Sequence, residues 1–295
     1  MQSLSKVRDL VELHCGIKDI GDKTAMNWGN VMEQVITNLT EIIFDCEIIE
    51  MGSIPTAGAQ HQRCSPDGVA IVKSLGNAIV SFEFKAPARR MPKSYIPKYY
   101  KSQVKAQLCA ITPSDFGIFV DTVLRRCEKK EWTFESVEYD KTYHPSYSFD
   151  KVFAKTILCF YNADGSVPSS PPVDYGAVNA DDFKKLLSDI AENKIIVAEY
   201  GRIIMPNKDS DITADEELST FMKKNAIGFV CTKVMKIVII PVSKEPDYIN
   251  KLQPKITEII DVIKQVNAED DYEKKCLICN KLCDEKKWEY AKRYN

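Results

Sequence analysis

Ser65-Pro66-Asp67-Gly68 opens the stretch SPDGVAIVKSLGNAIVSFEFK, residues 65–85, which predicts two strands joined by a tight turn. Val69 to Val72 and Ile79 to Phe84 are rich in apolar and β-branched residues, and the Gly and Asn of Ser74-Leu75-Gly76-Asn77 suit a short hairpin connection. Antiparallel pairing about this turn brings Asp67 opposite the neighbourhood of Glu83, to within a residue or two.

Apolar and polar residues alternate along the second strand, in the order Val80, Ser81, Phe82, Glu83, Phe84, Lys85. The apolar set therefore faces a core and the polar set faces away from it. Asp67 and Glu83 are then two carboxylates that can share a metal, and Mg²⁺ takes carboxylate oxygens together with substrate phosphate and water. Such a cation helps to hydrolyse a phosphodiester, because it neutralises developing charge and generates the nucleophile.

Lys85 follows Glu83 by two residues and lies on the same face of the strand. Beside a metal, its ammonium can orient the attacking water, help to deprotonate it, or stabilise the pentacovalent phosphate. The alternative is that Glu83 and Lys85 belong to the solvated face of an amphipathic strand.

A helix is predicted upstream of the hairpin. From Trp28 to Ile43 the apolar residues recur at helical spacing and, at ~100° per residue, form one stripe. Glu33 lies well off this stripe, so periodicity alone predicts a solvated carboxylate.

The segment 89–101 is dense in cations and aromatic residues and has no acidic residue. Its cations suit backbone phosphates, and its tyrosines suit stacking on the bases of a frayed or single strand. The candidate substrate-binding residues in it are Arg89, Arg90, Lys93, Tyr95, Lys98, Tyr99 and Lys101. The alternative is a basic surface loop whose tyrosines pack inward.

A second helix is predicted after this loop. Its buried face consists of Tyr100, Val104, Leu108 and Ile111. Gln103 and Gln107 lie one turn apart on an adjoining face, from which Gln103 can point at the two carboxylates. The alternative is that both glutamines are exposed.

Four ordered pieces of the chain resemble one family of nucleases. They are Trp28-Gly29-Asn30-Val31-Met32-Glu33, Ser65-Pro66-Asp67-Gly68, Glu83-Phe84-Lys85-Ala86-Pro87 and Tyr99-Tyr100-Lys101-Ser102-Gln103-Val104. Together they resemble the core of the PD-(D/E)xK nucleases, and more narrowly the branch of lambda exonuclease, the viral alkaline nucleases and the YqaJ-like viral recombinases. The resemblance covers residues 25–120, with a weaker echo at 226–266.

The resemblance implies a role for each matched residue. The implied catalytic residues are Glu33, Asp67, Glu83, Lys85 and Gln103. It implies one or two Mg²⁺ or Mn²⁺ ions held by Asp67, Glu83 and the Phe84 carbonyl, with Glu33 as a further candidate ligand. It also implies that Ser65 shapes the turn and contacts phosphate.

Two features depart from the pattern of that branch. Lys105 stands where a second glutamine is common. Met1 to Lys23 lack the Trp- and Arg-containing segment that helps to hold the terminal phosphate of the DNA. Exonuclease and endonuclease activity therefore both stay open.

The resemblance predicts an α/β fold, with a restriction-endonuclease-like mixed central sheet flanked by helices and a large insertion or added subdomain. Ile227 to Val242 predicts a strand and Tyr248 to Val266 a helix, similar to the strand and helix that close the family's core. We expect a single nuclease domain over residues 1–295, and two continuous domains are the alternative. The expected parts are a core at 25–122 and 226–268, an insertion at 123–225 and a C-terminal helical tail at 269–295. Within the insertion, Asp181 to Ile190 predicts a helix and Ile195 to Ile204 a strand.

The whole-chain composition is compatible with this fold. A chain of 295 residues that is 44% hydrophobic can bury a large core. Its net charge of −2 means that nucleic-acid binding depends on a local patch such as 89–101. With no apolar run that suits a signal peptide or a membrane span, we expect a soluble intracellular protein, in the host nucleus or cytoplasm if viral.

The ten cysteines are scattered and do not suggest a secreted disulfide framework, so reduced thiols are expected. Cys276, Cys279 and Cys283 invite a zinc or iron–sulfur interpretation, but no histidine lies near them in sequence and structural zinc usually has four ligands. We favour surface cysteines on a lysine-rich helix from Tyr272 to Tyr290.

The chain is therefore interpreted as a metal-dependent nuclease that hydrolyses phosphodiester bonds of DNA. The preferred version is a lambda-type or alkaline exonuclease in viral or phage-type DNA replication, recombination or repair. A homo-oligomer or a recombinase partner is compatible with that role. The alternatives are an RNA-cleaving nuclease, since metal and lysine chemistry does not read the 2′-hydroxyl, and a noncatalytic nucleic-acid-binding protein that keeps the fold.

Overall fold

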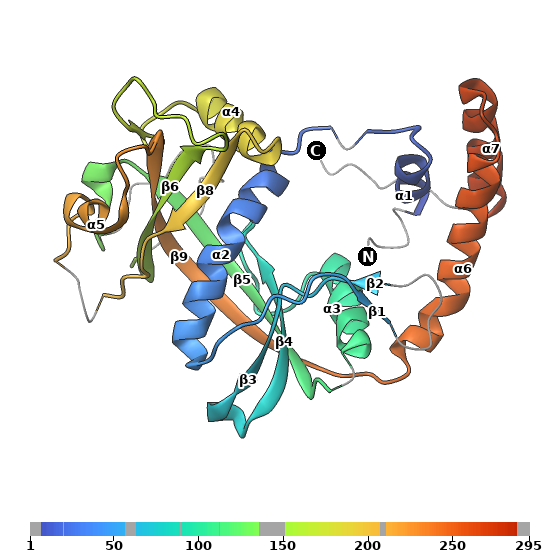
Figure 1. Cartoon of the computed structure of the whole chain (residues 1–295). Coiled ribbons are helices and arrows are strands. Elements are labelled where there is room, and N and C mark those ends of the chain that lie inside the picture. The colour runs from blue at the N-terminus through green and yellow to red at the C-terminus, as the bar shows by residue number, and fades with distance from the viewer. Residues whose placement is uncertain are drawn as a thin grey trace.

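A curved sheet and the helices that flank it make up most of the chain (Figure 1). The computed structural model describes residues 7–19, 21–56, 63–88, 90–111, 113–135, 151–206 and 211–287. The helices are α1 (Val7–His14), α2 (Thr24–Phe44), α3 (Lys98–Ala110), α4 (Ala180–Ala191), α5 (Ala214–Phe221), α6 (Tyr248–Asn267) and α7 (Tyr272–Glu285). The strands are β1 (Ile54–Pro55), β2 (Arg63–Cys64), β3 (Gly68–Val72), β4 (Ala78–Lys85), β5 (Phe116–Cys127), β6 (Ala154–Asn162), β7 (Val173–Asp174), β8 (Ile195–Tyr200) and β9 (Gly228–Ser243). In this part of the chain, no helix combines the length and the apolar character that crossing a membrane requires.

The main sheet has seven strands in the order β3-β4-β5-β9-β6-β8, with β7 paired to β9. β4 and β5 are parallel, whereas β3 and β4, β5 and β9, β9 and β6, and β6 and β8 are antiparallel. The predicted α/β class, with a mixed central sheet flanked by helices, is confirmed. β6, β7 and β8 come from residues 123–225 and join the same sheet as the hairpin of β3 and β4.

The predicted hairpin is present, and its register is well defined. Gly68 pairs with Phe82 and Val72 with Ala78. A short 3₁₀ helix, Lys73–Leu75, leads into Gly76 and Asn77, which both have a positive φ, of 73° and 62°. Gly and Asn tolerate this left-handed backbone better than other residues, which explains their place in the turn.

Helix α2 lies across one face of the sheet and contacts β4, β5 and β8 (Figure 1). Its apolar stripe, predicted from residue 28 onward, is buried in the largest core cluster, where it meets apolar residues of β4 such as Phe82. Removing such side chains from water is the main favourable contribution to folding, so this stripe fixes the side of α2 that faces the sheet.

Helix α3 contacts β4 and β5 with its own apolar face. Val104 and Leu108 pack on Phe119 of β5, and Tyr100 joins them. The predicted second helix is thus confirmed. Helix α3 therefore covers a face of β4 that would otherwise be open to solvent.

The N- and C-terminal helices α1, α6 and α7 form a separate helical layer beside the sheet (Figure 1). Cys279 and Cys283 of α7 are buried there against Val11 of α1 and Val262 of α6. The prediction of surface cysteines is therefore wrong for these two, because α1 comes from the other end of the chain to cover them. Helix α7 itself begins at Tyr272 as predicted and ends at Glu285, while positions 288–290 lie outside the described residues.

The strand and helices predicted in the second half of the chain are largely confirmed. α4 and α6 match their predicted ranges to within a residue, and β9 begins and ends one residue later than expected. β8 ends at Tyr200, before the predicted Ile204, which makes only an isolated bridge with Lys155. Beyond Tyr200, the backbone amide of Arg202 donates its hydrogen bond to the side-chain carboxylate of Glu217, at 3.2 Å. The acceptor there is a side chain and not the carbonyl of a neighbouring strand.

Candidate active site

Asp67 and Glu83 face each other at the open end of the hairpin. The register that pairs Gly68 with Phe82 makes them the next opposed residues. Asp67 Oδ2 accepts a hydrogen bond of 2.6 Å from the Phe84 amide. The three predicted ligand atoms therefore come from adjacent positions of two paired strands.

The Glu83 carboxylate is buried and hydrogen-bonded on both oxygens. Its residue is 1% exposed. Gln103 Nε2 lies 2.6 Å from Oε1, and Gln107 Nε2 lies 2.6 Å from Oε2. Lys85 Nζ also donates to Oε1. The alternative of a solvated strand face is therefore wrong, because α3 covers this face and supplies both amides.

Gln107 has a contact that sequence reasoning did not assign to the site. It is 2% exposed and donates both to Glu83 and to the Ser65 carbonyl, at 3.1 Å. The alternative of two exposed glutamines is thus wrong for Gln107. Lys105, which interrupts the family pattern, instead pairs with Glu245. Gln107 follows Gln103 by four residues, and residues four apart lie on one side of a helix. This spacing was the sequence feature that could have predicted the contact of Gln107 with Glu83.

Lys85 lies between the two carboxylates. Its Nζ contacts Glu83 and is 3.8 Å from Asp67 Oδ2, with the Tyr100 ring centroid 5.3 Å away. Burial acts to lower the pKa of Lys85, but Glu83 and Asp67 outweigh it and the pKa is raised above its ordinary value of 10.5. The side chain is therefore an ammonium at neutral pH.

Asp67 holds a proton more readily than an ordinary aspartate does. Burial raises its pKa to about 7, and the neighbouring Glu83 charge adds to this effect. Lys85 and the Phe84 amide act in the opposite direction. Two acids so close together in a buried place carry more negative charge than Lys85 alone neutralises, which is an environment that favours a bound cation.

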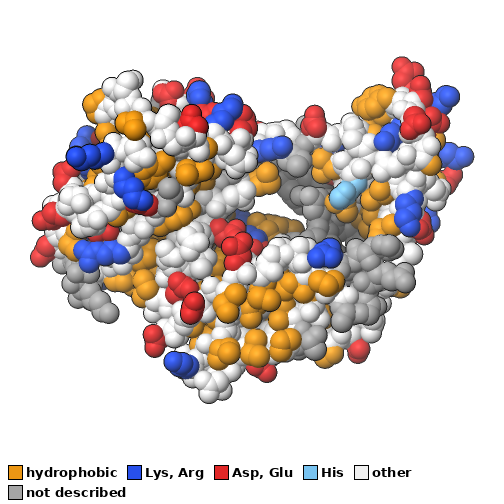
Figure 2. All heavy atoms as spheres, viewed as in Figure 1, with side chains coloured by type: hydrophobic (Ala, Val, Ile, Leu, Met, Phe, Trp, Pro, Cys, Tyr) orange, Lys and Arg blue, Asp and Glu red, His pale blue; other side chains and the backbone are white. Residues whose placement is uncertain are grey.

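Glu33 of α2 lies at the same end of the sheet. It is half-buried and lines a cavity of about 500 Å³ together with Asp67. Burial raises the pKa of Glu33, which Lys85 opposes. The periodicity-based expectation of a solvated carboxylate is therefore wrong: the face of α2 beside its apolar stripe borders the end of the hairpin. Acidic side chains gather over α2 beside the opening in the middle of Figure 2.

The lining of this cavity comes from several parts of the chain. It consists of Asn30, Glu33, Gln34, Thr37, Glu41, Ile48, Glu50, Asp67 and Tyr200. Tyr200 is the last residue of β8, so the predicted insertion reaches the same cavity as the hairpin. No local pattern in the sequence links Tyr200 to α2, so this contact was not predicted.

The predicted substrate-binding loop divides into an inner and an outer part. Arg90 Nη2 lies 2.9 Å from Oδ1 of Asp121, a fully buried residue of β5, and the guanidinium also lies over the Tyr100 ring. Tyr100 packs inward on Phe119. The remaining candidates are exposed at the surface, namely Ser65, Lys93, Tyr95, Lys98, Tyr99 and Lys101. Arg89 lies outside the described residues.

The donor atoms suit a hard cation with few protein ligands. Across the described ranges, no three His, Cys, Asp or Glu side chains converge in a preformed metal cage. Mg²⁺ commonly binds through one or two carboxylates and keeps water and substrate phosphate as its other ligands. Asp67, Glu83 and the Phe84 carbonyl fit that mode.

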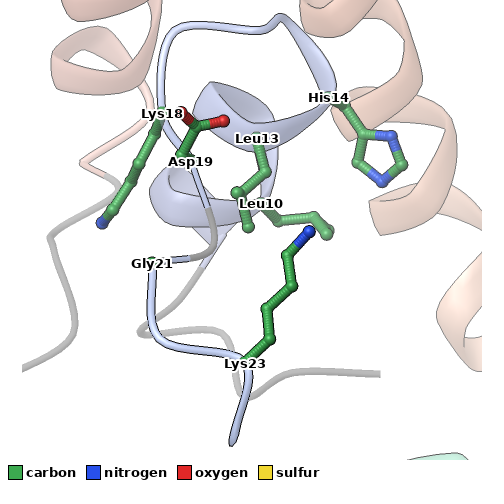
Figure 3. Close-up of a pocket in the computed structure, with 7 residues that line it drawn as sticks. All are labelled: Leu10, Leu13, His14, Lys18, Asp19, Gly21 and Lys23. Atoms are coloured by element: carbon green, nitrogen blue, oxygen red, sulfur yellow. The ribbon is translucent and has the colours of Figure 1, made fainter. Parts of the chain in front are cut away.

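A larger hollow lies at the N-terminal helix, away from these carboxylates (Figure 3). Its volume is about 710 Å³, and α1 and the segment after it provide its walls. The lining residues are Leu10, Leu13, His14, Lys18, Asp19, Gly21 and Lys23. Because no pair of carboxylates points into it, this hollow does not repeat the chemistry of the hairpin end.

Comparison with known families agrees with the motifs. Residues 3–114 match the family model described as the YqaJ-like viral recombinase domain. This part of the chain is thus similar to that domain. The matched residues include α2, the hairpin and α3, so the match covers all the side chains that meet at Glu83. The resemblance inferred from the four motifs is confirmed.

The chain also has relatives of viral origin. It is 23% identical over 284 residues to "Protein D345L" of African swine fever virus, isolate Tick/South Africa/Pretoriuskop Pr4/1996, which covers 86% of this chain and 77% of that protein. The protein of the same name from isolate Tick/Malawi/Lil 20-1/1983 is 24% identical over 286 residues, covering 87% and 77%. Together with the YqaJ-like domain, these matches support a viral nuclease.

Among solved structures, the chain is similar to an alkaline exonuclease from Laribacter hongkongensis. The sequence identity is 22% and the TM-score is 0.30. The match covers 40% of this chain and 66% of that chain, which is just under two thirds of its length.

Proposed function

We propose that this protein is a metal-dependent nuclease that hydrolyses phosphodiester bonds of DNA. The observation that carries the proposal is the buried contact of Glu83 with Lys85, Gln103 and Gln107, directly opposite Asp67. Burying a carboxylate among so many donors is costly for a protein that only needs to fold, since an apolar residue would serve there. The viral relatives and the YqaJ-like domain support a role in viral DNA recombination, replication or repair.

In the proposed site, Asp67, Glu83 and the Phe84 carbonyl hold Mg²⁺ or Mn²⁺. Glu33 is a candidate ligand for a second ion. When bound, the ion neutralises charge on the phosphate and makes water a better nucleophile. Gln103 and Gln107 fix the rotamer of Glu83, which keeps its oxygens in one orientation for the metal.

Lys85 acts as an electrostatic group in this proposal. Because its pKa is raised, it carries a positive charge and does not accept a proton from water in the resting site. Its ammonium lies next to both carboxylates, where it can donate to a phosphate oxygen as negative charge develops. The attacking water then loses its proton to another acceptor, for which the carboxylates are the nearest groups.

The DNA would approach along the exposed part of the segment 90–101. Lys98 and Lys101 can pair with backbone phosphates, and Tyr95 and Tyr99 can stack on unpaired bases. Arg90 is proposed to have an indirect role. Its ion pair with Asp121 and its contact with the Tyr100 ring would hold the loop in place. We further propose one nuclease domain, with residues 123–225 as an insertion and 269–295 as a helical tail.

The first experiment measures cleavage of linear duplex DNA by the full chain in Mg²⁺ or Mn²⁺. We expect Asp67→Asn and Lys85→Ala each to lower kcat by about a hundredfold or more, as loss of a group that stabilises transition-state charge does. Matched controls are Asp215→Asn and Lys130→Ala, an aspartate and a lysine whose exposed side chains lie far from β4 in the sequence. Full activity in Asp67→Asn and Lys85→Ala would reject the proposal.

A second comparison decides the type of nuclease. An end-labelled linear duplex, the same duplex closed into a circle, and an RNA of equal length are incubated with the protein. We expect loss of label from the linear DNA and an intact circle. Cleavage of the circle indicates an endonuclease, and preferential cleavage of RNA rejects DNA as the substrate.

A further inference from the structure

Strand β8 reaches the acidic cavity from the side opposite the hairpin. β3 and β8 are the two ends of the sheet order, yet Asp67, just before β3, and Tyr200, at the end of β8, line the same cavity. The curvature of the sheet and the crossing of α2 bring them together (Figure 1).

Tyr200 makes a defined polar contact with α2. Its hydroxyl donates to the Val31 carbonyl at 3.1 Å, two residues before Glu33. Val31 itself is buried in the core beneath the helix. The hydroxyl therefore binds the backbone of α2 at the turn from which Glu33 projects into the cavity.

Apolar packing alone leaves some freedom in the position of a helix. The stripe of α2 is aliphatic for most of its length, and such contacts are not directional, so the helix can shift or rotate slightly at little cost. A hydrogen bond to the helix backbone is directional. Asn27, about one turn before Val31, makes another directional bond: its own side-chain Nδ2 donates to the Leu187 carbonyl of α4, at 3.2 Å.

We propose that Tyr200 is a positioning residue for Glu33, through which residues 123–225 contribute to the active site. The hydroxyl holds the Val31 turn of α2, and thereby keeps the Glu33 carboxylate beside Asp67 and Lys85. This inference rests on the proposed metal-dependent nuclease. It gives the inserted segment a specific task, namely to set the distance between the helix acid and the hairpin acids.

The variant Tyr200→Phe tests this because it removes only the hydroxyl and keeps the ring. Mn²⁺ binding to the full-length protein is measured by calorimetry, and cleavage of linear duplex DNA is measured in parallel. We expect Mn²⁺ affinity to fall by about two- to tenfold, the range expected for losing one hydrogen bond. We expect kcat at limiting Mn²⁺ to fall by a similar factor, with KM for DNA unchanged.

Tyr161→Phe is the matched control. Tyr161 lies on β6, also within 123–225, and its hydroxyl accepts a hydrogen bond of 3.1 Å from the Lys223 amide in a separate core cluster. The control thus loses the same group and a bond to backbone, but away from α2. We expect its Mn²⁺ affinity to equal that of the wild type. An equal loss in both variants would overturn the proposal.

A double-mutant cycle with Glu33→Gln separates positioning from a general structural effect. If Tyr200 acts through Glu33, then Tyr200→Phe has no further effect on Mn²⁺ affinity once Glu33 is Gln. An equal loss in the two backgrounds, or no loss in Tyr200→Phe alone, overturns the inference and leaves the nuclease assignment intact. A wild-type protein that neither binds Mn²⁺ through Asp67 nor cleaves nucleic acid overturns both.

Discussion

Gln107 Nε2 lies 2.6 Å from Glu83 Oε2, while Gln103, one helical turn earlier, binds the other oxygen of the same carboxylate. Two side-chain amides of α3 therefore hydrogen-bond to a single carboxylate of β4. Because Gln107 also donates to the Ser65 carbonyl, one side chain links the helix, the strand and the turn before Asp67.

We predict that Gln107→Leu weakens metal binding. The substitution keeps the volume of the side chain but leaves Glu83 Oε2 without this donor, so the carboxylate can rotate. Loss of a group that orients a metal ligand typically costs 10–100-fold in affinity, and we expect about that loss in a calorimetric titration with Mn²⁺. Gln265→Leu, at an exposed position of α6, is the control. Unchanged affinity in Gln107→Leu would show that Glu83 needs no second amide.

Metal affinity should depend on pH through Asp67, whose pKa in the metal-free protein is raised to about 7. The cation binds the deprotonated carboxylate, so protons compete with it below that pH. Apparent Mn²⁺ affinity should rise by up to about tenfold per pH unit up to pH 7 and level off above it. Asp67→Asn should abolish this dependence. An affinity that is flat between pH 5 and 7 in the wild type would contradict the prediction.

The stability of the metal-free protein should show the opposite trend. A folded-state pKa of about 7, against 3.8 for the unfolded chain, means that folded Asp67 retains a proton that the unfolded chain has lost. Its contribution is fully present below the unfolded pKa and is lost as pH rises through the folded pKa. Denaturant unfolding at pH 5 and pH 8 should therefore show a smaller difference in Asp67→Asn than in the wild type.

Arg90 and Lys101 should differ in how they affect the protein. Arg90→Ala leaves buried Asp121 without its guanidinium partner, and breaking such a pair costs about 3–5 kcal/mol. Lys101 is exposed, so Lys101→Ala should leave the free energy of unfolding nearly unchanged. It should instead reduce the slope of log affinity for DNA against log salt by about 1. If the free energy of unfolding of Arg90→Ala equals that of the wild type, then Asp121 can be buried without an ion-pair partner.

The cysteines of α7 should respond according to burial. Cys283 is fully buried among apolar residues of α1 and α6, so Cys283→Ser places a hydroxyl there and should cost about 1–3 kcal/mol of unfolding free energy. Cys276 is only partly buried, and Cys276→Ser should change that free energy by less than about 0.5 kcal/mol. Thermal denaturation of both variants checks the difference. Equal melting temperatures would mean that the helical layer of α1, α6 and α7 does not pack as described.

Local sequence was enough to predict the hairpin, the two helices that flank it and the order of the motifs. Alternation along residues 79–84 and the Gly and Asn of the turn predicted the register to within a residue or two, and the observed register places Asp67 opposite Glu83. The stripe of α2 and the apolar face of α3 were likewise visible, because helical periodicity is a local property. The family resemblance depended on these same short pieces.

Other features depended on contacts between distant segments. Strands β5 and β6 are buried along nearly their whole length, so they lack the alternation that reveals a half-exposed strand, and neither was predicted. Burial of Glu83 required α3 to cover β4, and the pairing of Arg90 with Asp121 required β5 beside β4.

The sequence by itself thus determined that Asp67, Glu83 and Lys85 lie near one another, because spacing within a strand and a hairpin sets where neighbouring side chains point. Only the tertiary structure decided how that chemistry is enclosed. It brought Glu33 to the end of the hairpin, placed Gln107 on Glu83, and carried Tyr200 across the sheet to α2. Those contacts join residues from 24 to 169 positions apart, and such pairings follow from how whole layers pack, which no local pattern encodes.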